Sequence, residues 1–206
     1  MTPTPDASTP PGADARPALD WTRQLLDQVD WHWTRQLRPR LDGLTDAEYL
    51  WEPVPGSWTV RRRGEPGPVP AQAGGIQGGA GDWVIDFAWP EPVPVPVTTI
   101  AWRLGHVIVG VLAARNASHF GGPPADYMTW SYAGTAAEAL AQLDEAYAGW
   151  IAGVRGLDPA ALAAPCGPAE GPYAAEPMAT LVLHINRELI HHGVEIALLR
   201  DLYAHR

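Results

Sequence analysis

Apolar residues recur at three- and four-residue intervals in four stretches of the 206-residue chain, a spacing typical of one buried face of an α-helix. The first stretch predicts a helix from Ala18 to about Asp42, which Pro39 is expected to kink or end near its last turn. Its apolar face consists of Trp21, Leu25, Val29, Trp33 and Leu37. A short helical turn is expected to follow Thr45, from Asp46 to Trp51.

Two central helices have clear boundaries. The second helix is expected to start at Thr98 or Thr99, either of which is a good N-cap, and to end near His119. It is apolar on almost every side, so it should lie in the middle of the protein. The third helix is expected to start at Thr135, which forms a capping box with Glu138, and to end at Gly156.

The last helix is expected from Pro177 to about Tyr203, because proline is well tolerated in the first turn of a helix. No stretch alternates between polar and apolar residues well enough to predict a β-strand. Four helices of roughly 20 to 28 residues predict an all-α protein built as a four-helix bundle.

Two segments fall outside these helices. Residues 1–17 are rich in proline and have no apolar periodicity, so we expect a disordered tail before a domain at 18–206. Residues 53–97 are rich in proline and glycine, and a loop of this length inside a compact domain is often functional or mobile. It could fold over a site, but a solvated excursion is the simpler interpretation for Arg61 to Gly81.

Composition narrows the classes of function. The net charge is −9, so we do not expect nucleic acid binding, because neutralising phosphates requires positive charge. The single cysteine, Cys166, excludes an internal disulfide and fits a reducing compartment. We see neither an apolar stretch long enough to span a membrane nor a signal peptide, so a soluble, cytoplasmic protein is expected.

The last predicted helix carries a stripe of ionisable residues. His184, Glu188 and His192 follow one another at four-residue intervals, and Glu195 extends the row. Because their neighbours are apolar, the stripe is expected to face the interior at least in part. Ionisable groups are costly there unless they pair with one another or bind a metal.

His106 is the matching candidate on the second helix. A single histidine on an apolar helix is more often a satisfied core residue than a metal ligand. The combination with ligands on another helix is a stronger signal, because helical bundles assemble metal sites from facing helices. Two histidines and one carboxylate suit zinc, nickel, iron or manganese.

Three segments of the chain resemble the DinB-like (YfiT-like) family of four-helix metalloproteins. They read LDGLTDAEYLWEPVPGSWTV, TTIAWRLGHVIVGVL and HINRELIHHGVEIALLRDL. The resemblance covers roughly residues 18–204 and makes the segment from about 61 to 92 a long Pro/Gly-rich insertion between helices one and two. The ligand pattern is most similar to the branch that contains mycothiol-dependent maleylpyruvate isomerase.

This resemblance implies a divalent metal, most often zinc and in some members nickel, held by His106, Glu188 and His192. Members commonly have histidine where this chain has Glu188. His184 therefore stays open as the alternative ligand, with Glu188 then beside the ligands instead of among them. Further candidates for supporting the site or contacting substrate are His191, Arg103, Arg187 and Trp102.

By the same resemblance we expect an enzyme that uses a low-molecular-weight thiol, such as mycothiol, for sulfur transfer to an electrophilic small molecule or for its isomerisation. A homodimer is also expected. Two alternatives remain open: a metal-binding sensor or interaction protein without turnover, and a hydrolase in which metal-bound water replaces the thiol. A bundle whose histidines and glutamates are purely structural would have none of these functions.

Overall fold

The computed structural model describes residues 19–206, so the predicted tail at 1–17 lies outside the described residues. As expected, the described chain is mostly helical. Its helices are α1 (Trp21–His32), η1 (Trp33–Leu37), α2 (Arg38–Arg40), α3 (Asp46–Tyr49), η2 (Ala71–Ala73), α4 (Ile100–His106), η3 (Val107–Ala113), α5 (Ala114–Phe120), α6 (Ala136–Arg155), α7 (Pro159–Ala163), η4 (Pro168–Tyr173) and α8 (Met178–Ala204). Its strands are β1 (Val60–Arg62), β2 (Gly75–Gly78) and β3 (Trp83–Ala88).

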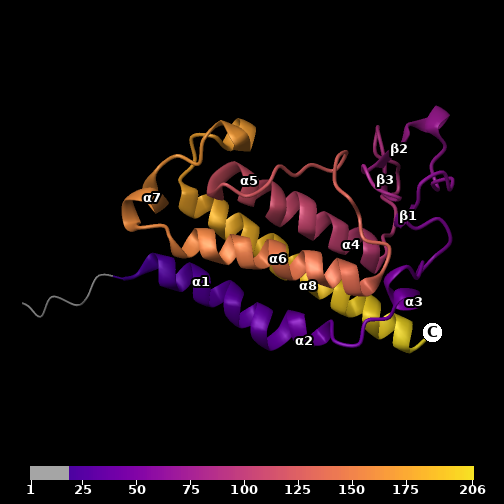
Figure 1. The fold of residues 1–206 in the computed structure, drawn as a ribbon, viewed down its shortest axis with the longest axis horizontal. Helices are drawn as coiled ribbons and strands as arrows, with labels where there is room; N and C mark the ends of the chain where they lie inside the picture. The colour runs from indigo at the N-terminus through magenta and orange to yellow at the C-terminus, as the bar shows by residue number, and fades with distance from the viewer. Residues whose placement is uncertain (1–18) are drawn as a thin grey trace, which may run out of the picture.

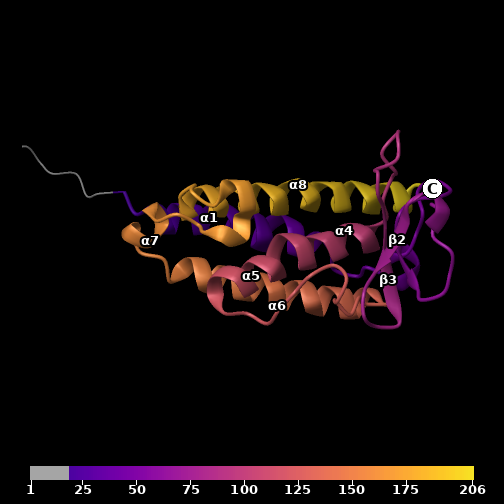
Figure 2. The same ribbon diagram turned by 90° about the horizontal axis from the view of Figure 1, so that it is seen from above.

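Four long helical segments share one core. The first runs through α1, η1 and α2, the second through α4, η3 and α5, and the others are α6 and α8. The first segment packs against α6 and α8, and the second packs against the same two helices. Figures 1 and 2 show the four segments running side by side along the long axis of the molecule. Among residues 19–206, no helix has both the length and the apolar character that crossing a membrane would require.

The core consists of the apolar faces that the periodicity predicted. Leu104, Leu112, Leu143, Trp150 and Leu189 are almost completely buried where the segments meet. Each such side chain stabilises the fold by roughly 1.5–3 kcal/mol relative to an exposed position.

Most helix boundaries follow the capping signals. The side chains of Thr45, Thr99 and Thr135 accept hydrogen bonds from backbone N–H groups in the first turns of α3, α4 and α6. The first segment ends at Arg40, directly after Pro39, as predicted. The last helix differs slightly, because Pro177 is its N-cap instead of a residue of its first turn.

Two helical segments contain π-helical turns that the sequence did not indicate, η1 and η3. A π-turn adds one residue to the helical repeat and is frequent at functional sites. The η3 turn begins directly after His106. It therefore changes the direction in which the side chains after His106 point away from the helix axis.

The prediction that the chain has no strand was wrong. Three short strands form an antiparallel sheet in the order β1-β3-β2 (Figure 1). Alternation failed to reveal β3 because both of its faces are covered. Val84, Ile85 and Asp86 are consecutive residues, and all three are buried.

The sheet is anchored to α4, whereas between Arg61 and Gly81 every residue except Gly78 is exposed or half-buried, so the interpretation of this stretch as a solvated excursion holds in part. The Asp86 carboxylate is buried and accepts hydrogen bonds from the Arg61 guanidinium at 2.8 Å and the backbone N–H of Thr59 at 3.1 Å. The indole N–H of Trp102 donates to the backbone carbonyl of Asp86 at 2.8 Å. This contact fixes the proline- and glycine-rich segment one helical turn before His106.

Candidate metal centre

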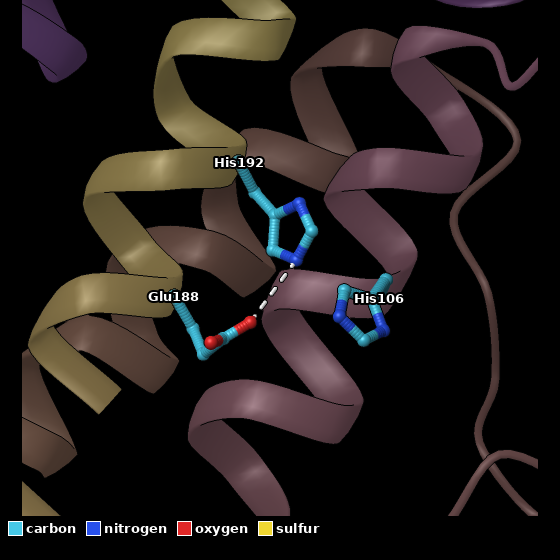
Figure 3. Close-up of side chains that lie close together, drawn as sticks. All are labelled: His106, Glu188 and His192. Carbon is cyan, nitrogen blue, oxygen red and sulfur yellow. Dashed lines mark ion pairs between the residues drawn. The ribbon is translucent and has the colours of Figure 1, made fainter. Parts of the chain in front are cut away.

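The three predicted ligands lie together between α4 and α8. One donor atom each from His106, Glu188 and His192 can be chosen so that all three lie within 4.8 Å of one another. Figure 3 shows the three side chains converging from two helices. Nε2 of His192 lies 3.5 Å from a carboxylate oxygen of Glu188, and the two imidazole rings are 4.7 Å apart between centroids. Side chains from α4 and α8 therefore come together as expected. Metal binding by these residues stays a prediction.

Both histidines have their Nδ1 atoms occupied by other protein groups. Nδ1 of His192 is 2.6 Å from a carboxylate oxygen of Glu195, and Nδ1 of His106 is 2.6 Å from the Tyr127 hydroxyl. With the proton on Nδ1, each ring donates to its partner and keeps the Nε2 lone pair available for a metal. Metal-binding histidines usually hold their second nitrogen in this way. A ring nitrogen of His106 faces Glu188 and His192 (Figure 3).

The electrostatic environment favours the neutral form of His106. Burial lowers the pKa of His106 to about 3, and the nearby His192, Arg103 and Arg115 act in the same direction. Metal binding requires a neutral imidazole, so no proton has to be displaced from this ring near neutral pH. For Tyr127, burial also favours the neutral form and raises the pKa to about 12, although the charge of Arg115 opposes this change. Tyr127 therefore keeps its phenolic proton.

Tyr127 is a site residue that the sequence did not reveal. It lies in the loop between α5 and α6, and its ring stacks against His106 with 5° between the planes. Its hydroxyl reaches His106 only because Gly110 has no side chain, since a Cβ at Gly110 would collide with that hydroxyl. The one signal in the sequence was Gly110 itself, a glycine inside an apolar helix, which often marks a close approach of another group.

Arg103 and Trp102 lie on α4, the helix of His106, and contact the candidate ligands or their partners. Arg103 forms an ion pair with Glu195 at 3.2 Å, and Glu195 in turn holds His192. Burial lowers the pKa of Arg103, while Glu195 opposes this change. The Trp102 ring stacks on His106 with centroids 5.5 Å apart. Both side chains thus fix the ligands, and their contact with a substrate stays a prediction.

Glu188 and His184 are the two candidates for the second ligand on α8, and their surroundings differ. His184 lies 3.5 Å from Glu188 but is not part of the cluster with His106. Its Nδ1 atom is 2.6 Å from the guanidinium of Arg187. Glu188 is therefore better placed than His184 to complete the donor set. His191 forms a second close group with His192 and Glu195, although its side chain is 62% exposed.

The chemistry of the donor set fits a divalent metal. Two imidazoles and one carboxylate are a common ligand combination for zinc and for other divalent transition metals. Three protein donors are typical of catalytic zinc sites, whereas structural sites usually have four. The arrangement can therefore support chemistry at a metal as well as binding.

One of three comparisons with known proteins gives a match. A family model described as the DinB superfamily matches residues 86–196, a stretch that contains His106, Glu188 and His192. Comparison with curated proteins and with solved structures gives no significant match.

Proposed function

Because the chain belongs to the DinB superfamily, whose members commonly bind divalent metals, we propose that it is a metal-dependent enzyme that acts with a low-molecular-weight thiol. The reaction would transfer the sulfur to an electrophilic small molecule or isomerise that molecule. The four long helical segments would then form the four-helix bundle of this superfamily. His106, Glu188 and His192 would hold the metal, zinc before nickel.

The observation that carries this proposal is the pre-arranged donor set. His106 and His192 come from different helices, and each has its Nδ1 atom held by another residue. Such an arrangement costs little reorganisation when a metal binds. Simple core histidines would not require a nitrogen atom from each of two imidazoles and a carboxylate oxygen to converge on the same small volume.

A metal held at this site would make a thiol a suitable cosubstrate. A divalent ion lowers the pKa of a thiol that coordinates it, so that the reactive thiolate forms near neutral pH. The surrounding residues would hold these ligands in place. Phe87 of β3 packs edge-on against both Trp102 and Tyr127, which closes one side of the site. The choice of a thiol over water rests on the similarity of the ligand pattern to the mycothiol-dependent isomerase branch.

Metal analysis of the full chain tests the ligand assignment. Protein purified without a histidine tag should contain roughly one divalent metal per chain, and Glu188→Ala should lose most of it because one of three donors is gone. His205→Ala is the matched control, since this residue lies at the end of α8. Unchanged metal content in Glu188→Ala would remove Glu188 from the ligands, and loss in His184→Ala would assign the alternative.

Turnover assays test the activity. The metal-loaded protein should consume a small thiol in the presence of an electrophile, and a chelator should abolish this consumption. Metal binding without turnover would indicate a sensor or interaction protein. Hydrolysis of esters or amides at the same rate with and without thiol would indicate the hydrolase.

A further inference from the structure

A cavity of about 710 Å³ lies between η4 and the first half of α8. This volume is within the range of small-molecule binding sites. Part of its wall is apolar, from Tyr173, Leu181 and Leu183. The polar part includes Arg115, Glu170, His184 and Arg187.

The cavity borders the candidate metal centre. His184 lies one helical turn before Glu188 on α8, and its Nδ1 atom is 3.5 Å from a carboxylate oxygen of Glu188. On the other wall, Arg115 donates a hydrogen bond to the backbone carbonyl of Gly110, in the helical turn that follows His106. A ligand in the cavity would therefore lie next to residues from both ligand-bearing helices.

The two arginines in the wall have different partners. Arg115 is paired with Glu170 at 3.2 Å, and Glu170 also contacts Nε2 of His119 at 2.9 Å. The charge of Arg115 is therefore balanced. Arg187 lies 3.6 Å from Glu188, which within the described residues is its only ion-pair partner. Glu176 also lines the cavity but pairs with neither arginine in residues 19–206.

Metal binding would change this balance of charge. Once Glu188 is a metal ligand, its carboxylate no longer neutralises Arg187, and His184 loses the same acidic neighbour. The Arg187 side chain is 70% exposed, so it can reorient toward a ligand. A guanidinium prefers a carboxylate, which it can bind through two parallel hydrogen bonds.

We propose that this cavity binds a carboxylate group of the small thiol used at the metal centre, with Arg187 and His184 as its contacts. The proposal rests on the proposed function, because it requires Glu188 to act as a metal ligand. It defines the cosubstrate as a small thiol that also carries a carboxylate, and therefore as a thiol other than mycothiol, in which the cysteine carboxyl group is an amide. Arg187 determines specificity and is not needed for metal binding.

Calorimetric titration of the zinc-loaded full chain tests the proposal. The probes are 3-mercaptopropionate, which carries a thiol and a carboxylate, and 2-mercaptoethanol, which carries the thiol alone. Arg187→Gln should weaken binding of 3-mercaptopropionate about tenfold, the scale of one lost charge-assisted hydrogen bond. Binding of 2-mercaptoethanol and the zinc content should not change. Arg23→Gln, at an exposed arginine on α1, is the matched control.

The outcomes separate the two proposals. Equal affinity of wild-type protein and Arg187→Gln for 3-mercaptopropionate, with both thiols still binding, would overturn the cavity assignment and leave the proposed function intact. If neither thiol binds to wild-type protein that contains zinc, thiol use is wrong and the cavity assignment fails with it.

Discussion

Among single residues, Tyr127 offers the sharpest test of how the candidate ligands are held. Tyr127→Phe removes the hydroxyl that bonds to Nδ1 of His106 but keeps the ring that packs against Phe87. Loss of such a partner typically lowers metal affinity about 10- to 100-fold, whereas stability should fall by only about 1 kcal/mol. Zinc affinity measured by competition with a coloured chelator, beside urea unfolding, separates these effects.

Tyr147→Phe is the matched control for this substitution. Its hydroxyl is hydrogen-bonded to Asp30 on α1 and takes no part in the cluster. Zinc affinity should therefore match that of the wild-type protein. Equal zinc affinity in Tyr127→Phe would show that Tyr127 is only a packing residue.

The site was predictable from sequence where it depends on regular spacing. Glu188 and His192 are four residues apart on a helix, so the period of the helix alone places them on one face. The partner of His106 was not predictable, because Tyr127 comes from a loop and reaches the site through the space left by Gly110. Such a contact depends on tertiary structure and leaves no periodic signal.

Among secondary-structure elements, the long helices were predictable and the sheet was not. A helix of α6's length repeats its apolar pattern over several turns and starts at a recognisable cap. The strands β1 and β2 have only three and four residues, too few for a pattern to repeat. At Gly75, the first residue of β2, a Cβ would collide with the backbone carbonyl of Val69, so a glycine that indicated a loop is required by the close approach of the preceding loop to the strand.

The attachment of η4 to α5 predicts a pH-dependent contribution to stability. Burial alone would raise the pKa of Glu170, but its hydrogen bond with His119 and the charge of Arg115 lower the pKa below the usual value of 4.5. The unfolded chain therefore binds this proton at a higher pH than the folded protein does. The stabilisation is complete above the unfolded pKa and is lost as the pH falls through the lower pKa of the folded state.

Glu170→Gln should therefore reduce the free energy of unfolding by about 1–3 kcal/mol near neutral pH. Its difference from the wild-type protein should shrink as the pH falls below the unfolded pKa. Urea unfolding of chelator-treated protein over this pH range measures the difference. Glu91→Gln, an exposed acid in the segment before α4, serves as the control. A difference that does not change with pH would contradict a role for the Glu170 charge.

For the whole molecule, the candidate site predicts that a metal stabilises the fold. His106 belongs to the second helical segment and Glu188 to the last, so the donor set exists only when these segments are packed together. A ligand that binds only the folded state at a hundredfold excess over its dissociation constant adds about 2.7 kcal/mol. In a chain of this size, such a gain corresponds to a rise in Tm of roughly 5 to 11 °C.

Thermal unfolding with zinc and with a chelator measures this coupling. The wild-type protein should show the full difference in Tm, and Glu188→Gln should show little of it because the variant retains the shape of the side chain but not its charge. His205→Gln should behave like the wild-type protein, since His205 lies outside the cluster. The same Tm with zinc and with chelator in the wild-type protein would mean that no metal joins α4 to α8. The convergence of His106, Glu188 and His192 would then serve packing alone.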